Sequence, residues 1–154
     1  SARKNKKCGG KIKMEKLNDI TEKIMNEWFG KDNVISLATA ENNVPYVRSV
    51  NAYYENGAFY VITYALSGKM KQLAGNPQCA VSGEWFTALG TGENLGWFKS
   101  PENEAVAASL RNAFSEWIDN GHNNFDDPNC VILKIKLKNG VLFSNGTRYD
   151  IEFK

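Results

Sequence analysis

The middle of the chain alternates apolar and polar residues with a period of two, which is typical of β-strands with one buried face. Residues 44–55 and 58–64 show this alternation on either side of Asn56-Gly57, a dipeptide that favours a two-residue type I′ turn. The pattern therefore predicts a β-hairpin. The two-residue loop also fixes the expected pairs, which are Tyr54 with Phe59, Ala52 with Val61, Val50 with Thr63, Ser49 with Tyr64 and Arg48 with Ala65.

Further strands are predicted from the same alternation. They cover residues 34–40, 79–86, 131–137, 141–144 and 147–153. Turns are expected at residues 41–43 and at two more Asn-Gly dipeptides, residues 139–140 and 145–146. Residues 90–96 contain three glycines, and we expect a tight hairpin turn there. A nucleotide-binding loop is not favoured, because aromatic strand residues follow it instead of helix formers.

The first helical pattern begins at Asn18 or Asp19, either of which can cap a helix. Glu22 is placed for a capping box, and Gly30 is placed for the C′ position that ends the helix. An apolar stripe with helical spacing is expected to cover the core. It consists of Leu17, Ile20, Ile24 and Trp28.

Two more helices are predicted further along the chain. Ser67 is the expected N-cap of the second, and Asn76-Pro77 is its stop signal. The third begins at residues 100–101, a Ser-Pro pair suited to N-cap and N1, and is expected to end at Gly121. Its predicted buried stripe is Val106, Leu110, Ala113, Phe114 and Trp117.

About seven strands joined by tight turns, together with three helices, predict a mainly β fold. The expected architecture is a split antiparallel β-barrel of about 6–7 strands with three flanking helices. Residues 14–154 are expected to form one domain, since a chain of 154 residues with 42% hydrophobic residues suits a single core.

The net charge of +2 is unevenly distributed. Six of the 19 basic residues lie in residues 1–13, which leaves 13 basic against 17 acidic residues in the rest of the chain. We interpret residues 1–13 as a flexible basic tail that need not belong to the natural protein, and we expect no nucleic-acid partner. No apolar run approaches the length of a membrane span, and no secretory signal precedes the domain, so a cytoplasmic location is expected.

The cysteines and the single histidine do not predict a metal site. Three cysteines lie far apart without a Cys-x-x-Cys pair, which favours neither a disulfide framework nor zinc. Cys79 and Cys130 lie in apolar strand patterns and are expected to be small buried hydrophobic residues. His122 lies in a polar loop without a nucleophile motif. Asp126-Asp127 lacks calcium-type spacing and is expected to be a solvated turn.

Three residues around the central hairpin could together bind an anion. The second helix begins at Ser67, with Lys69 in its first turn, and the hairpin register brings Arg48 to the same place. Free backbone N–H groups and the helix dipole add positive potential there. The natural ligand is a phosphate. The alternative is a capped helix with solvated lysines.

The order Arg-Ser-Val, Asn-Gly, Phe-Tyr-Val-Ile-Thr-Tyr, Ser-Gly-Lys and Asn-Pro over residues 48–77 resembles the FMN-binding split β-barrels of the pyridoxamine 5'-phosphate oxidase-like superfamily. The general stress protein-like branch is the nearest fit. The resemblance implies that the two strands hold the flavin ring and ribityl chain, while the serine and lysine bind the phosphate. It implicates Arg48, Ser49, Val50, Thr63, Tyr64, Ser67 and Lys69 in cofactor binding.

Two departures from the family pattern bear on function. Gly68 stands where pyridoxamine phosphate oxidases tend to have a second basic residue, which would change phosphate affinity. The arginine signature that they use on their substrate is missing from the C-terminus, so vitamin B6 oxidation is not expected. Trp85 is either a neighbour of the ring, often from a second subunit in this family, or a packed core or interface residue.

The resemblance thus implies an FMN-dependent oxidoreductase with a small-molecule redox substrate. It also implies a homodimer with the flavin at the subunit interface, and no metal or membrane. Two alternatives stay open. One is a non-catalytic flavin carrier or redox sensor, and the other is the same barrel with deazaflavin or haem.

Overall fold

The computed structural model describes residues 14–153. The predicted tail at residues 1–13 lies outside this part. The strands within it are β1 (Glu15–Lys16), β2 (Asn33–Glu41), β3 (Val44–Glu55), β4 (Ala58–Tyr64), β5 (Gln78–Gly83), β6 (Phe86–Trp97), β7 (Cys130–Ser144) and β8 (Thr147–Glu152). The helices are α1 (Asp19–Phe29), α2 (Gly68–Gly75) and α3 (Glu104–Ala113), with a 3-10 turn at Pro101–Asn103 before α3.

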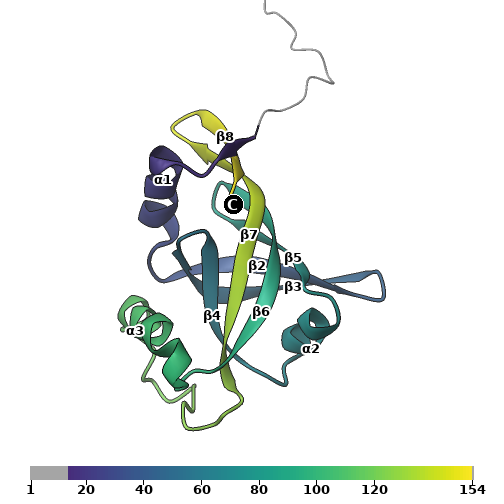
Figure 1. Ribbon diagram of the computed structural model, residues 1–154, viewed down its shortest axis with the longest axis vertical. Coiled ribbons are helices and arrows are strands. Elements are labelled where there is room, and N and C mark those ends of the chain that lie inside the picture. Colours follow the sequence, from purple (N-terminus) through teal and green to yellow (C-terminus); the bar gives the residue numbers. More distant parts are fainter. Residues whose placement is uncertain (1–13, 154) are drawn as a thin grey trace, which may run out of the picture.

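Six of these strands close into an antiparallel barrel. The sheet order is β1-β8-β7-β4-β3-β2-β5-β6, and an additional pairing between β6 and β7 closes the ring. β7 is the longest strand and runs through most of the molecule (Figure 1). β8 extends the sheet beyond the barrel, and β1 pairs with it in parallel. The predicted mainly β split barrel with three flanking helices is confirmed.

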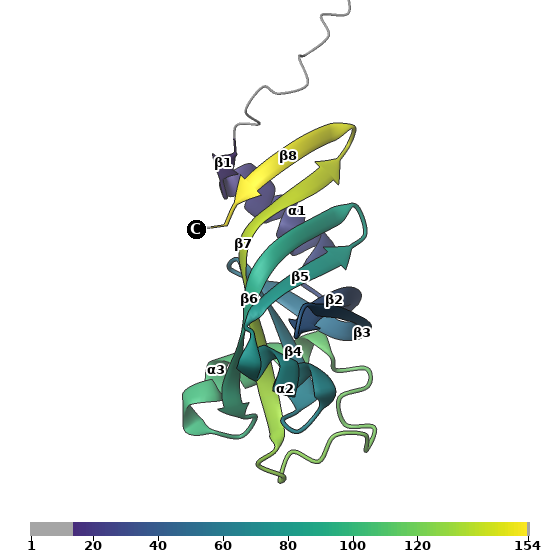
Figure 2. The same cartoon turned by 90° about the vertical axis from the view of Figure 1, so that its right-hand side faces the viewer.

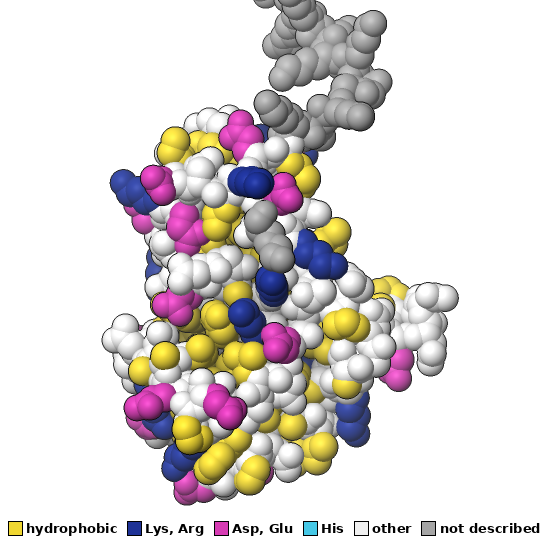
Figure 3. All heavy atoms as spheres, in the orientation of Figure 1, with side chains coloured by type: hydrophobic (Ala, Val, Ile, Leu, Met, Phe, Trp, Pro, Cys, Tyr) yellow, Lys and Arg dark blue, Asp and Glu magenta, His cyan; other side chains and the backbone are white. Residues whose placement is uncertain are grey.

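The barrel interior is filled by the inward-facing residues of each strand. Fully buried side chains include Leu37, Ala52, Tyr54, Phe59, Leu133 and Leu142. A second apolar cluster lies outside the barrel, where Leu110 of α3 and Phe114, the residue after the helix, pack near Ile132 of β7. Hydrophobic side chains gather in the lower half of the face shown in Figure 3, where α3 covers the barrel. Figure 2 shows α2 and α3 at the end of the barrel remote from β8.

The predicted hairpin between β3 and β4 forms only at its turn. Asn56 and Gly57 have the positive φ angles of 47° and 80° that the turn needs. The observed pairs are Tyr53–Tyr60, Tyr54–Phe59 and Glu55–Ala58. The predicted pairs from Ala52–Val61 to Arg48–Ala65 are wrong, because the two strands separate beyond Tyr53–Tyr60 while each stays paired on its other edge, β3 with β2 and β4 with β7. The barrel splits at this divergence.

Two predicted glycine turns are also wrong. Residues 139–140 lie inside β7, and residues 90–96 lie inside β6. A Cβ atom on Gly140 would lie 2.7 Å from the carbonyl oxygen of Thr87, so glycine is needed here for close strand approach. A Cβ on Gly90 would lie 2.8 Å from the carbonyl oxygen of Lys136, beside a register shift between β6 and β7. The strand predicted at residues 79–86 ends at Gly83, and the turn at residues 145–146 is confirmed.

Helix α1 differs from its prediction in its buried face. Asn18 is the N-cap, but Thr21 completes the capping box in place of Glu22. The buried residues are Thr21, Met25 and Phe29, while Ile20 is 63% exposed. Leu17, Ile24 and Trp28 of the predicted stripe are partly buried and pack against the core as predicted, so only Ile20 lies off the buried face. Gly30 is the C-cap with an ordinary φ of −75°, not a left-handed C′ residue.

Glu22 instead joins α1 to the barrel. Its Oε2 accepts a hydrogen bond of 2.8 Å from the hydroxyl of Tyr54, and that hydroxyl oxygen accepts one of 3.0 Å from the N–H of Gly57. Burial, followed by the interaction with Glu22, raises the pKa of Tyr54. The hydroxyl therefore stays protonated and keeps α1 attached to the turn of the hairpin.

Helix α3 is shorter than predicted. The Ser-Pro start is confirmed, but the first turn is a 3-10 turn, and the α-helix stops at Ala113. Asn103 is buried at the junction, where its Nδ2 donates to the carbonyl oxygens of Leu95 and Trp97 at 3.0 and 2.8 Å. Phe114 and Leu110 are buried as predicted. The chain after residue 113 continues in turns toward β7.

Candidate functional site

A cleft opens where β3 and β4 diverge. It is a pocket of about 490 Å³ lined by Val50, Asn51, Val61, Ile62, Lys69, Trp117, Asn120, His122 and Asn123, and we call it the β3–β4 cleft. Its β-strand residues lie beyond the last β3–β4 pair, Tyr53–Tyr60. The cleft thus lies where these two strands are no longer paired with each other.

Helix α2 follows β4 and places its N-terminus beside this cleft. Ser67 is its N-cap, as predicted, but the side chain makes no capping hydrogen bond. Its Oγ is buried and has no hydrogen-bond partner in the part of the chain that the structure describes. A buried hydroxyl without a partner is costly, and an acceptor reaching it would remove that cost.

Arg48 connects β3 with α2. Its Nη1 donates to the carbonyl oxygen of Leu37 at 3.2 Å and to Oγ1 of Thr39 at 2.8 Å. Its Nη2 donates to Oε1 of Gln72 on α2 at 2.8 Å. All three acceptors are neutral, so the guanidinium is oriented without being neutralised. Burial lowers the pKa of Arg48 from its ordinary value, and the group remains charged at neutral pH.

Lys69 lies in the first turn of α2 and lines the β3–β4 cleft. Burial, followed by repulsion from Arg48, lowers the pKa of its amine. Within residues 14–153 neither Lys69 nor Arg48 forms an ion pair with a carboxylate. Two nearby positive charges without a counter-charge favour the binding of an anion.

The donors present fit a phosphate group. Lys69 and Arg48 supply positive charge, Ser67 supplies a free hydroxyl, and the first turn of α2 supplies backbone N–H groups that have no partner within the helix. Charge-assisted hydrogen bonds of this kind are the strong ones. The apolar residues Val50 and Val61 continue the site toward the barrel. The arrangement suits a ligand with one anionic end and one apolar end.

The remaining residues implicated in cofactor binding lie around this centre in different environments. Val50 is buried and lines the cleft. Ser49 is exposed and pairs with Ser36 on the outer face of the sheet. Thr63 is 9% exposed, Tyr64 is 50% exposed, and neither lines the cleft. The structure therefore brings Arg48, Val50, Ser67 and Lys69 together around the cleft and α2, and a cofactor-binding role stays a prediction for all seven residues.

Sequence reasoning did not assign the far wall of the cleft. Trp117, Asn120, His122 and Asn123 come from the segment after α3. Trp117 was predicted as part of the buried helix stripe, and His122 stood out only as the single histidine. Thr39 and Gln72, which orient Arg48, were also not assigned. Their roles depend on tertiary contacts that no local pattern encodes.

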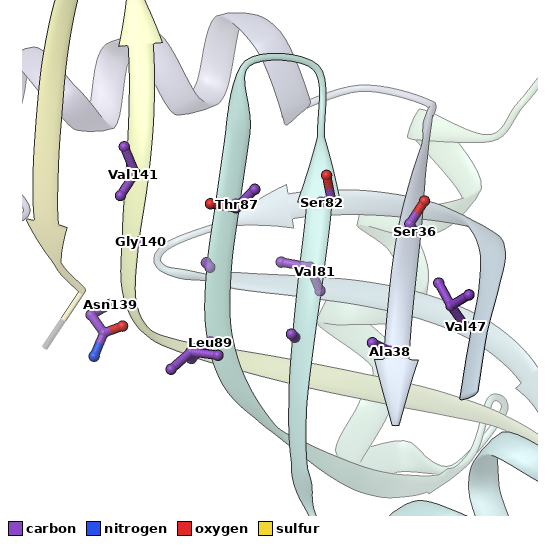
Figure 4. A pocket seen from close by; sticks show the side chains of 12 residues that line it. Ser36, Ala38, Val47, Val81, Ser82, Thr87, Leu89, Asn139, Gly140 and Val141 are labelled. Atoms are coloured by element: carbon purple, nitrogen blue, oxygen red, sulfur yellow. The ribbon is translucent and has the colours of Figure 1, made fainter. Parts of the chain in front are cut away.

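The outer face of β2, β3, β5 and β6 carries small and apolar side chains. We call this outer face the sheet face. It surrounds a shallow pocket of about 360 Å³ (Figure 4), and the residues that line the pocket include Ser36, Ala38, Val47, Ala80, Ser82 and Leu89. Val47 is 71% exposed and Leu89 is 54% exposed. Val47, Ser49 and Asn51 point to one side of β3, so the sheet face continues along this strand into the β3–β4 cleft.

The two cysteines in the part of the chain that the structure describes, Cys79 and Cys130, do not line the cleft. Cys79 and Cys130 are buried and unpaired, as predicted. Burial raises the pKa of the Cys79 thiol to about 11, so the thiol is protonated and unreactive at neutral pH.

The described residues contain no group of three His, Cys, Asp or Glu side chains suited to hold a metal ion. Their helices include none long and apolar enough to cross a membrane.

No protein-family model and no curated protein matches the sequence. Solved structures share the fold. A FAD-binding protein from Mesorhizobium loti is 17% identical with a TM-score of 0.61, covering 80% of this chain and 92% of that one. A protein from Clostridium acetobutylicum, related to general stress protein 26 of B. subtilis (pyridoxinephosphate oxidase family), is 14% identical with a TM-score of 0.54, covering 77% and 84%. A haem-binding protein from Mycobacterium smegmatis is 16% identical with a TM-score of 0.62, covering 80% and 54%.

Proposed function

We propose that this chain is an FMN-binding flavoprotein of the pyridoxamine 5'-phosphate oxidase-like split-barrel superfamily. The observation that carries the proposal is the combination of the β3–β4 cleft, whose lining is part apolar and part polar, with a candidate anion site at its end. Lys69 belongs to both. The fold is shared with proteins named for flavin binding and for the pyridoxinephosphate oxidase family, which supports the same assignment.

Each residue has a distinct part in this proposal. Lys69, Arg48 and the hydroxyl of Ser67 would hold the phosphate at the start of α2. Gln72 and Thr39 hold the guanidinium of Arg48 in place. The edges of β3 and β4, including Val50, would border the ribityl chain and the ring. A phosphate oxygen that accepts a hydrogen bond from Ser67 would also give this buried hydroxyl the partner it lacks.

An oxidoreductase activity with a small-molecule redox substrate is part of the proposal. When bound, the flavin supplies hydride or electron transfer, and the protein contributes binding, orientation and the exclusion of water. The apolar cleft residues Val50, Val61 and Ile62 would keep water from one side of the ring. Assays of NAD(P)H oxidation and photoreduction separate this activity from a non-catalytic flavin carrier or sensor.

The proposed assembly is a homodimer with the flavin at the subunit interface. The sheet face offers exposed apolar side chains at Val47 and Leu89, and such patches commonly mark interaction surfaces. We assign it to a second copy of this chain, because it runs along β3 directly into the β3–β4 cleft. A partner seated on the sheet face would therefore cover the open side of the cleft. A two-fold dimer is the commonest closed assembly.

The visible spectrum of the purified protein, with and without added FMN, tests the cofactor. A bound flavin spectrum that gains intensity to one FMN per chain is the expected result. Haem is a second candidate, because His122 lines the β3–β4 cleft and imidazole is an ordinary axial ligand. A Soret band in place of the flavin bands would assign haem and overturn the FMN proposal, and a deazaflavin spectrum would also overturn it. The cytoplasmic location stays a prediction.

A further inference from the structure

One wall of the β3–β4 cleft comes from the segment that follows α3, residues 114–123. Four of its side chains line the cleft, namely Trp117, Asn120, His122 and Asn123. The opposite lining comes from β3, β4 and α2 of the same chain. A single subunit therefore builds two sides of the cleft from segments that lie more than forty residues apart in sequence.

Trp117 is fixed in orientation by its neighbours. Its Nε1–H donates a hydrogen bond of 2.7 Å to Oδ2 of Asp32. Oδ1 of the same carboxylate accepts one of 3.3 Å from Nδ2 of Asn51 on β3, so Asp32 joins the wall to the strand. On the other side the indole stacks on Phe114, with ring centroids 4.6 Å apart and planes at 29°. The indole is thus oriented before a ligand arrives, which reduces the entropy lost on binding.

The chemistry of this wall suits a flat heteroaromatic ligand. The indole of Trp117 can pack on another aromatic ring in an offset or edge-to-face arrangement. Val61 and Ile62 add apolar contact on the strand side. The amides of Asn120 and Asn123 offer both donors and acceptors, which match the carbonyl and N–H groups at the edge of such a ring.

We infer that Trp117 packs against the flavin ring from within the same subunit, and that Asp32 is a positioning residue that acts through Trp117. This inference rests on the proposed function and deepens it. It assigns a ring contact that is separate from the phosphate contact of Lys69. The two contacts are separable by experiment, because riboflavin has the ring and lacks the phosphate.

Trp85 of the same chain cannot make this contact. Its carbonyl oxygen accepts a hydrogen bond of 3.0 Å from the N–H of Phe143, near the end of β7. Ile62 of the cleft pairs with Ile132, at the start of β7. Ile132 and Phe143 are eleven positions apart along β7, which corresponds to on the order of 30 Å of extended strand. Trp85 could reach the ring only from a partner subunit.

Substitution of each tryptophan by phenylalanine tests the inference. An excited flavin in contact with an indole takes an electron from it and returns it, so emission is lost without net chemistry. Trp117→Phe should raise the fluorescence of bound FMN several-fold and weaken FMN and riboflavin by the same factor, about threefold to tenfold. Trp85→Phe is the matched control and should change neither. Unchanged emission in Trp117→Phe, or a rise in Trp85→Phe alone, would overturn the inference.

The positioning role of Asp32 has its own pair of variants. Asp32→Asn keeps an oxygen acceptor for the indole N–H and should bind riboflavin as the unsubstituted protein does. Asp32→Ala removes the acceptor and should weaken riboflavin binding toward the level of Trp117→Phe. Equal riboflavin affinity in Asp32→Ala and the unsubstituted protein would show that Asp32 does not act through Trp117.

A spectroscopic measurement on the unsubstituted protein tests the inference even if the Trp117→Phe variant does not fold. The protein has four tryptophans, so labelling with 5-fluorotryptophan gives four fluorine resonances. The resonance of Trp117, assigned by elimination with phenylalanine variants of the others, should shift most when riboflavin is added. A larger shift of Trp85 would overturn the inference.

If the protein binds neither FMN nor riboflavin, the proposed function and the inference both fail. If it binds both and Trp117 does not respond, only the inference fails.

Discussion

Lys69 and Ser67 show two signs of a site that is prepared for an anion. Taking an amine out of water and placing it near Arg48 lowers its pKa, which is a cost to the folded protein. Leaving the hydroxyl of Ser67 buried without a partner is a second cost. Proteins keep such costs mainly at functional sites, where a ligand removes them. A phosphate would relieve both.

Lys69→Ala should weaken FMN binding by roughly tenfold to a hundredfold, because one charge-assisted contact to a phosphate contributes about 1.5–3 kcal/mol. Riboflavin affinity should stay unchanged. Lys71→Ala is the matched control, since Lys71 is exposed two residues further along the same helix. Fluorescence titration of both ligands measures the effect. An equal loss for riboflavin would place Lys69 at the ring and not at the phosphate.

The same lysine should make FMN binding depend on pH. A lysine is charged below its pKa, and the pKa of Lys69 lies below its ordinary value of 10.5. The advantage of FMN over riboflavin should therefore shrink as the pH rises through this lowered pKa. The comparison with riboflavin cancels any titration of the ring. Lys69→Arg keeps its charge at high pH, and its FMN advantage should stay constant over the same range. A parallel decline in Lys69→Arg would assign the effect to another group.

The residues of the anion site could be predicted from the sequence better than the residues that contact the ring. Ser67 and Lys69 follow a strand and begin a helix, which is a local pattern that can be read directly. Arg48 was placed correctly near them, but through a register that does not form. Trp117 and His122 reach the cleft only because the segment after α3 packs back on β3 through Asp32. A contact between residues 32 and 117 leaves no local signal.

The elements show how one dipeptide can have two outcomes. Asn145-Gly146 forms a turn with φ angles of 49° and 77°, whereas Asn139-Gly140 stays inside β7. The difference is tertiary, because β7 has β6 on one side and β8 on the other through this point. Gly140 allows β6 to lie close to β7 and does not form a turn. Most strands and all three helices could be predicted from periodicity and caps, but their lengths depended on such neighbours.

Gly140→Ala should destabilise the protein by about 1–3 kcal/mol, because the new Cβ would meet the carbonyl oxygen of Thr87 and the Cβ of Ala88. Gly75→Ala is the control, since nothing lies within 4 Å of its added Cβ, and a gain of up to about 1 kcal/mol is expected. Urea unfolding curves measure both. Equal midpoints for Gly140→Ala and the unsubstituted protein would show that β6 and β7 can move apart without cost.

The described residues form a barrel that splits between β3 and β4 and that carries exposed apolar side chains on the sheet face. Closure by the pairing of β6 with β7 could not be predicted from the sequence, because it joins strands separated by the whole of α3. The family resemblance implied a split barrel, but the sequence predicted a continuous hairpin of β3 with β4, so the place of the split was not predicted. Both features serve the proposed site, since the split makes the cleft and the sheet face borders it. The proposed dimer follows from this geometry.

Val47→Lys should convert the proposed dimer to monomers of about 17.2 kDa and weaken FMN binding, because it places a charge in the sheet face beside the cleft. Ile20→Lys is the control, since Ile20 is similarly exposed but lies on α1. Sedimentation at several protein concentrations, with and without FMN, gives the mass. A Val47→Lys protein that remains dimeric would place the interface elsewhere, and an unsubstituted monomer that binds FMN tightly would refute the shared site.

We propose that the β3–β4 cleft and the start of α2 together bind a flavin through both its ring and its phosphate. Parallel calorimetric titrations of the unsubstituted protein with FMN and with riboflavin test it most directly. We expect one FMN per chain, bound at least about a hundredfold more tightly than riboflavin, because two or more charge-assisted contacts hold the phosphate. Equal affinities for the two ligands, or no binding of either, would contradict it.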